Sequence, residues 1–316
     1  MKKNSCKIIG TVVMLLVFVF IAATGAFGEE ETFTIGLSMH FMRDDYAVNV
    51  VDSVQQVADQ YNSDVIVADA NADPQKQLSD IENLVIRGVD ALIVVPMDET
   101  AIMAGLTRAN EQNIPVIAIT HIPDAEVITT VGGQGDWNNG KATAELMLEA
   151  LGDKESAKIL VIQIGFTLWR LEQRELAFLE TMTASDIDIE FIYTSGVDQD
   201  DLQNKVQNTL LAHPDLDGVY APFGNALVGA SDAVQLANRP GVVVTGIDAD
   251  LAVIERIKEG WIHGVAAQFP KQHGTLSAEA AFNFLMGESI EEEYDVPIGV
   301  VTLENADEMS NIIWGE

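Results

Sequence analysis

Two polar side chains stand at the ends of successive predicted strands, with one predicted helix between them. The apolar run 242–247 predicts a buried strand that ends at Asp248, and the apolar run 262–267 predicts another that ends at Gln268. In an open parallel sheet the carboxyl ends of the strands line the ligand crevice, so Asp248 and Gln268 are expected to share one mouth. A carboxylate accepts charge-assisted hydrogen bonds, so Asp248 is a candidate acceptor for the hydroxyl groups of a ligand.

Aromatic and polar side chains follow several other predicted strands. Aromatic rings supply area for the C–H face of a polyhydroxyl ligand, and filling the core is the alternative role for each ring. The candidate aromatic walls are Tyr46, Trp169 and Phe223, with Phe41 as a further one. The further candidate polar contacts are Thr120, His121, Glu172 and Asn225.

His40 and His121 each follow a predicted strand and can act as neutral donors and acceptors toward a ligand. A solvated loop position is the alternative for both. They could also bind a metal with Glu172 or Asp248, but no tight ligand spacing such as HxxxH is present, so we expect neither a metal nor a cofactor. Arg43 is the cation of its loop and could pair with neighbouring aspartates or with a ligand oxygen. Asp136 is predicted to be an N-cap or a contact between lobes.

Motifs and charge exclude several classes of function. The sequence contains no GxSxG, no P-loop and no GxGxxG after a predicted strand, so we expect a binding protein and not an enzyme. The 316-residue chain carries a formal net charge of −32, which disfavours nucleic acid because phosphate contacts need Lys and Arg.

The first 28 residues have the pattern of a secretory signal peptide. Lys2, Lys3 and Lys7 precede an apolar run, and the small residues at 26–28 end in Gly28, near which we expect cleavage. Cys6 lies within this segment, so the exported chain would contain no cysteine. The mature protein is predicted to be located in the periplasm.

Between residues 33 and 303, short apolar runs alternate regularly with segments of helical spacing. This alternation is typical of a doubly wound parallel sheet. The alternation occurs twice, on either side of Gly132-Gly133, and no low-complexity linker separates the halves. The sequence therefore predicts a two-lobed α/β protein with about five strands in each half.

Several segments together resemble the type I periplasmic binding proteins, in particular the ribose-binding branch that serves ABC sugar importers. These segments are IRGVDALIVVPMD, NIPVIAI, LLAHPDLDGVYA, VVVTGIDA and VAAQFPKQHG. The resemblance extends from Phe33 to about Leu303 and rests on the order and spacing of the segments.

The resemblance implies two Rossmann-like lobes with parallel sheets, joined by a three-strand hinge and closing on a ligand. It implies an N-terminal lobe of residues 29–133 plus 269–297 and a C-terminal lobe of residues 134–268 plus 298–316. It also implies a monomer that delivers a small neutral sugar or polyol to the membrane permease of an ABC importer. A sensory receptor is the alternative: it would present a sugar-like signal, similar to autoinducer-2, to a membrane sensor.

The resemblance also assigns roles to residues. Asp248 matches the family's acidic acceptor of sugar hydroxyls, Gln268 matches its hinge glutamine, and Tyr46 falls where the family stacks an aromatic ring on the sugar. Elsewhere the chain departs from the ribose-binding pattern. Thr120 and His121 replace an Asp-Arg pair, Glu172 replaces a ligand-binding arginine whose neighbour matches Arg174, and Phe223 replaces an asparagine. These departures make ribose itself a poor expectation for the ligand.

Overall fold

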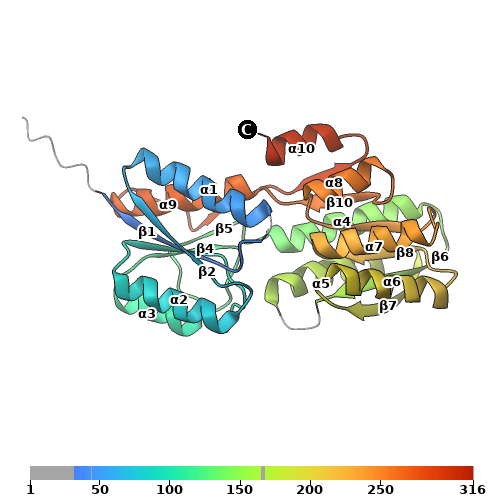
Figure 1. The fold of residues 1–316 in the computed structure, drawn as a ribbon, viewed down its shortest axis with the longest axis horizontal. Coiled ribbons are helices and arrows are strands. Elements are labelled where there is room, and N and C mark those ends of the chain that lie inside the picture. The colour runs from blue at the N-terminus through green and yellow to red at the C-terminus, as the bar shows by residue number, and fades with distance from the viewer. Residues whose placement is uncertain (1–31, 44, 165–167, 316) are drawn as a thin grey trace, which may run out of the picture. The chain divides into compact units, whose positions relative to one another are not determined.

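A computed structural model describes residues 32–43, 45–164 and 168–315 of the chain (Figure 1). The predicted signal peptide and its cleavage near Gly28 lie outside the described residues. From Thr32 onward the chain forms one compact unit that contains two six-stranded sheets.

The first sheet has the strand order β11-β5-β4-β3-β1-β2, and every neighbouring pair in it is parallel. Its strands are β1 (Thr34–Met39), β2 (Asp64–Asp69), β3 (Ala91–Val94), β4 (Val116–Ile119), β5 (Thr129–Val131) and β11 (Glu293–Tyr294). We call this sheet and the helices that cover it the first lobe.

Side chains of the first sheet alternate between two buried faces, as the period of a strand requires. Ile35, Leu37 and Ile93 point into one core, which α1 (Asp45–Gln60) and α9 (Pro270–Leu285) cover. The opposite face belongs to a second core under α2 (Pro74–Arg87) and α3 (Met103–Glu111). Helix α9 comes late in the chain, yet it packs beside α1 (Figure 1).

The second sheet has the order β12-β10-β9-β8-β6-β7. Its strands are β6 (Ser156–Gln163), β7 (Asp188–Ser195), β8 (Gly218–Ala221), β9 (Val243–Ile247), β10 (Gly264–Ala267) and β12 (Gly299–Thr302). Its helices are α4 (Gly135–Leu151), α5 (Trp169–Thr183), α6 (Gln199–Ala212), α7 (Gly224–Leu236), α8 (Leu251–Lys258) and α10 (Ala306–Trp314). We call this assembly the second lobe.

The chain passes between the two sheets at three places, because each sheet takes strands from separate parts of the sequence. The passages follow β5, β10 and β11. Residues from all three passages, including Gly132, Gln268 and Pro297, line one small cavity. The predicted fold class of two α/β lobes with mostly parallel sheets is confirmed.

The C-terminal part differs in detail from the prediction. The apolar residues within 296–303 predict a final strand, and this strand is β12 of the second sheet. The two-residue β11, which completes the first sheet, was not predicted. Strand β12 pairs antiparallel with β10, because the chain reaches it directly from the hinge without a crossover helix. Within the described residues, none of the helices is long and apolar enough to traverse a bilayer.

Candidate functional site

Asp248 and Gln268 lie together at the carboxyl ends of β9 and β10, as the strand pattern predicts. The side-chain amide nitrogen of Gln268 donates to Oδ1 of Asp248 at 2.8 Å. The backbone N–H of Gly224, at the start of α7, donates to Oδ2 of the same carboxylate at 3.1 Å. The Asp248 side chain remains 24% exposed, so it is oriented by its neighbours and still open to a ligand.

Two of the predicted site residues have a backbone that L-residues rarely adopt. Asp248 has φ of 86° and Thr120, at the end of β4, has φ of 68°. Such a conformation is unusual for any residue with a side chain and more so for a β-branched one. The N–H of Asp248 donates to Ala266 O and the N–H of Thr120 donates to Val131 O, both at 2.9 Å. Local strain of this kind clusters at functional sites, where the surrounding structure holds it in place.

A buried ion pair lies next to the Asp248 carboxylate and helps to orient it. Nε of Arg174, on α5, donates to Oδ1 of Asp136 at 2.7 Å, and the two side chains are only 6% and 2% exposed. Nη1 of Arg174 donates to Pro222 O and lies 3.9 Å from Oδ1 of Asp248. Gly140, one turn after Asp136, permits this approach of α4 to α5, because a Cβ there would lie 2.1 Å from the carbonyl oxygen of Arg174.

The electrostatics of this group favour a fixed guanidinium. Burial works against the charge of Arg174, but Asp136 and Asp248 outweigh it and raise the pKa of the guanidinium. The Arg174 guanidinium therefore holds the carboxylates of Asp136 and Asp248 in place. Its positive charge also lowers the pKa of His40 and His273 in the first lobe.

The first lobe presents aromatic and imidazole rings. His40 follows β1, and its ring centroid lies 4.2 Å from that of Phe41 and 6.3 Å from that of Tyr46. The hydroxyl of Tyr46, in the first turn of α1, lies 3.1 Å from Nδ1 of His273 on α9. The close packing of α1 and α9 therefore brings His273 next to residues more than two hundred positions earlier in the chain.

Both of these histidines are buried and neutral at pH 7. Burial, and then the charge of Arg174, lower the pKa of His273 to about 4. Burial, and then the charges of Arg170 and Arg174, hold the pKa of His40 well below its ordinary value. Nδ1 of His40 is buried and has no hydrogen-bond partner among the residues that the structure describes. A buried polar atom without a partner is unusual in a folded protein and is costly unless a bound group supplies the hydrogen bond.

The start of α5 contacts loops of the first lobe. The centroid of the His121 ring lies 5.0 Å from that of the Trp169 ring. The backbone N–H of Trp169 donates to Oε2 of Glu99 at 3.3 Å. Arg170 Nη1 donates to Pro96 O at 2.8 Å. Burial raises the pKa of the Glu99 carboxyl. His121 and Trp169 are thus brought together, as expected for two residues of one crevice.

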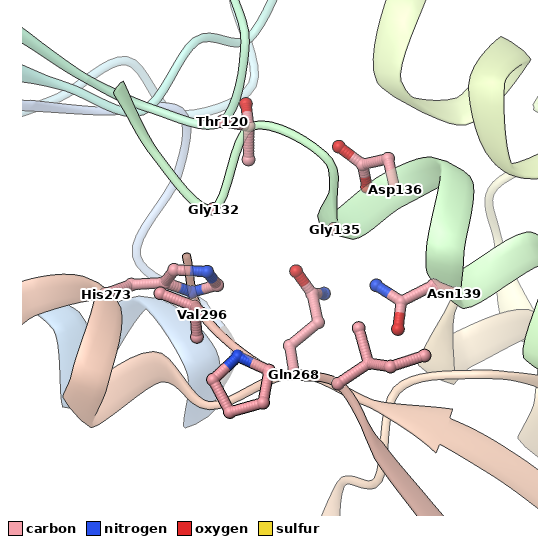
Figure 2. A pocket seen from close by; sticks show the side chains of 10 residues that line it. Thr120, Gly132, Gly135, Asp136, Asn139, Gln268, His273 and Val296 are labelled. Carbon is pink, nitrogen blue, oxygen red and sulfur yellow. The ribbon is translucent and has the colours of Figure 1, made fainter. Parts of the chain in front are cut away.

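A small cavity lies where the three passages between the sheets meet (Figure 2). Its volume is about 10 Å³, which is room for one group the size of a water molecule. Figure 2 shows the Gln268 amide projecting into it between His273 on one side and Asp136 and Asn139 on the other. The lining residues are Thr120, Gly132, Gly135, Asp136, Asn139, Gln268, His273, Val296, Pro297 and Ile298.

The other predicted site residues lie toward the surface or the core. Arg43 is exposed and donates to Oδ1 of Asn71. Glu172 and Asn225 are exposed in the first turns of α5 and α7. Phe223 is half-buried at the N-cap of α7 and packs against the core of the second lobe. No hydrogen bond or ion pair joins the side chains of these four to the Asp248–Gln268 pair within the described part of the chain.

Asp136 is not the helix N-cap that was one of its two predicted roles. It is the second residue of α4 and not its N-cap, a position that Gln134 holds without a side-chain bond. Its charge is directed instead at Arg174 of the same lobe.

The sequence interpretation assigned no site role to Arg174, Asn139, His273 or Glu99. A signal existed for two of them. Arg174 shares a helix face with the buried Ala177 and Phe178, and His273 shares one with the buried Ser277. A charged or polar side chain on a buried helix face requires a buried partner, so each of these positions pointed to a polar site.

Among the described residues, no group of three or more His, Cys, Asp or Glu side chains is placed to hold a metal ion.

Comparison with known proteins places this site in context. Residues 35–289 match a family model described as a periplasmic binding protein domain. The chain is similar to the ribose import binding protein of Bacillus subtilis, with 27% identity over 282 residues, which is 87% of this chain and 89% of that protein.

Two solved structures are similar in fold. One is a periplasmic solute-binding protein of an ABC transporter from Actinobacillus succinogenes with bound D-allose; it is 26% identical, covers 88% of this chain and all of its own, and has a TM-score of 0.79. The other is an ABC transporter solute-binding protein from Bacillus halodurans with bound myo-inositol; it is 25% identical, covers 89% of this chain and 98% of its own, and has a TM-score of 0.81.

The family model covers most of the chain, and the two lobes match its fold. The family is one of solute-binding receptors of ABC transporters rather than of enzymes, and its location is periplasmic. The resemblance seen in the sequence motifs is thereby confirmed. The chain belongs to the periplasmic binding proteins, with the type I fold and in the ribose-binding branch.

Proposed function

We propose that this protein is an exported receptor that captures a small sugar or polyol between its two lobes and delivers it to an ABC importer. The observation that carries the proposal is the Asp248 carboxylate, which Gln268, Gly224 and Arg174 orient and which is still partly exposed. Relatives that bind D-allose and myo-inositol support this class of ligand.

The binding site in this proposal has two walls. Asp248 accepts hydrogen bonds from hydroxyl groups of the ligand, and the Gln268 amide can both accept and donate them. The rings of Tyr46, Phe41 and Trp169 contact the C–H faces of the ligand. The other proposed polar contacts are His40, Thr120, His121, Glu172, Asn225 and Arg43. Phe223, which packs against the core of the second lobe, is a further proposed aromatic contact. Glu172, Asn225 and Arg43 are exposed in the structure and would contact ligand only as part of the rim.

The lobes in this proposal comprise residues 29–133 with 269–297, and 134–268 with 298–316. The assignment is supported by the two sheets, because β11 joins the first sheet and β12 joins the second. Closure about the three passages would bring the two walls onto the ligand.

The partners in this proposal are the ligand and the membrane permease of the importer, and the receptor acts as a monomer. The relatives support an import role. They do not support the alternative of an autoinducer-like signal receptor.

A thermal-shift panel of sugars and polyols tests the proposal. A ligand that binds only the native state raises the melting temperature by mass action. We expect at least one pentose, hexose or cyclitol to do so. A panel in which only amino acids, purines or organic acids shift the transition would contradict the proposed function.

A further inference from the structure

The hinge cavity presents hydrogen-bond acceptors to any group that enters it. The Gln268 amide nitrogen donates to Asp248, which as a carboxylate can only accept, so the orientation of this amide is fixed. Its oxygen must therefore face the other way, and Figure 2 shows it turned into the cavity. In this orientation Gln268 offers the cavity its amide oxygen as an acceptor.

Asp136 supplies a second acceptor. Its Oδ1 accepts from Arg174, but its Oδ2 is buried and has no hydrogen-bond partner among the described residues. The side chain is 2% exposed and lines the cavity, as Figure 2 shows. A buried carboxylate oxygen without a donor is costly unless a bound group supplies one.

Carboxylates outnumber guanidinium groups in the ion-pair cluster beside the cavity. Asp136 and Asp248 are two carboxylates that share one guanidinium, Arg174. His273 adds no positive charge at pH 7, because burial keeps it neutral. A carboxylate or phosphate in this place would face two like charges, whereas an ammonium would form charge-assisted bonds with the same oxygens.

The cavity also limits size. Its volume of about 10 Å³ admits a single non-hydrogen atom with its hydrogens, such as a hydroxyl or an ammonium group. A methoxyl group has one heavy atom more than this volume admits.

We propose that the hinge cavity is a subsite for one hydrogen-bond-donating substituent of the ligand, and that it binds a protonated amine more tightly than the corresponding hydroxyl. The ligand class that this selects is an amino-substituted sugar or cyclitol. The inference rests on the proposed function, and it replaces the neutral ligand expected from the sequence with one that carries a single positive charge.

Matched ligand series test the inference by calorimetric titration of the purified protein at about pH 6, where an alkyl amine is protonated. The series are built on D-allose, D-ribose and myo-inositol, each as the parent, its monoamino-deoxy derivatives and its mono-O-methyl derivatives. In at least one series we expect an amine to bind about tenfold more tightly than the parent, equivalent to about 1.4 kcal/mol. In the same series, one mono-O-methyl isomer should bind at least about tenfold more weakly than the parent.

Variants of the cavity assign the effect to its residues. Asp136→Asn removes the charge at nearly constant size, so the preference for the amine over the parent should disappear. Asp232→Asn is the matched control, because it removes a carboxylate from the same lobe that pairs with Arg256 between α7 and α8. It should leave the ratio of affinities unchanged. If Asp136→Asn does not fold, Asn139→Asp decides, because an added carboxylate in the cavity must increase the preference for the amine.

The outcomes separate this inference from the proposed function. If parent sugars or polyols bind but no amine binds more tightly, or Asn139→Asp leaves the ratio unchanged, the inference is wrong and the proposed function stands. If no member of these series binds, the same series is built on the sugar or polyol that shifts the melting temperature most. If no sugar or polyol shifts it, the proposed function itself fails and the inference fails with it.

Discussion

The two walls of the site are built from different chemistry. The wall of the second lobe is charged: Arg174 binds Asp136 directly and supports Asp248 at 3.9 Å, and all three are held by backbone or side-chain bonds. The wall of the first lobe, His40, Phe41, Tyr46 and His273, is aromatic and carries no charge at pH 7. The difference indicates that polar recognition is fixed in the second lobe, while the first lobe contributes shape and neutral hydrogen bonds.

The largest effect should come from breaking the charged wall. Arg174→Met leaves Asp136 as a buried carboxylate without its cation, and such losses cost about 3–5 kcal/mol of unfolding free energy. Urea denaturation measures the change. The matched control is Arg256→Met, which breaks a partly exposed pair with Asp232 and should cost about 1 kcal/mol or less. Equal losses in the two variants would remove the distinction between a buried and a surface ion pair.

The neutral wall should make the protein sensitive to acid. The pKa of His273 falls from 6.5 in an exposed imidazole to about 4 in the folded protein, so below pH 6.5 the unfolded chain binds more protons than the folded one. Folding stability is then lost progressively as pH falls from about 6.5 to 4, by up to ~3 kcal/mol from this residue.

A single substitution isolates that contribution. His273→Gln removes the titrating ring, so the decline in unfolding free energy between pH 7 and 4 should be shallower than in the unmodified protein. His263→Gln, at an exposed histidine, is the control and should leave the slope unchanged. Parallel pH curves for the protein and the His273→Gln variant would mean that the imidazole is not held neutral by its burial.

Asp248→Ala tests the acceptor at the centre of the charged wall. Hydrogen bonds to charged groups are worth about 1.5–3 kcal/mol, so the dissociation constant of the best sugar or polyol should rise about 10- to 150-fold. Calorimetric titration measures it, with Asp232→Ala as a control that breaks the pair with Arg256. An unchanged dissociation constant in Asp248→Ala would show that the sugar or polyol does not contact the end of β9.

The smallest effect should come from the hydroxyl of the neutral wall. Tyr46→Phe keeps the ring but removes the group that lies 3.1 Å from Nδ1 of His273, and one neutral hydrogen bond contributes about 1 kcal/mol to stability. Urea denaturation at pH 7 measures the loss. A loss as large as that of Arg174→Met would show that the two walls do not differ as described.

The sequence predicted the frame of the fold because its signals are local. Apolar runs such as 91–95 and 242–247 mark strands, and each is separated from the next by a helical pattern, so the alternation, the two halves and the positions of Asp248 and Gln268 all follow. Strand β11 and helix α10 were missed. Two residues are too few for a strand pattern, and the helix follows a polar segment at the end of the chain.

The remainder of the site depends on contacts that are remote in sequence. His273 meets Tyr46 across 227 positions, and Arg174 meets Asp136 only because Gly140 lets two helices approach closely. No periodicity encodes such pairs. The predicted ligand roles of Glu172, Asn225 and Arg43 came from their places in loops after strands and, for Glu172, also from the family resemblance. All three are exposed in the structure, and their ligand roles stay predictions.

The most direct test of the central claim is a crystal structure of the protein with the sugar or polyol that binds it most tightly. We expect the ligand between the lobes, with hydroxyl groups within hydrogen-bonding distance of Asp248 and Gln268 and a C–H face against Tyr46 or Trp169. A ligand bound elsewhere, or between the lobes without contact to Asp248 and Gln268, would contradict the account.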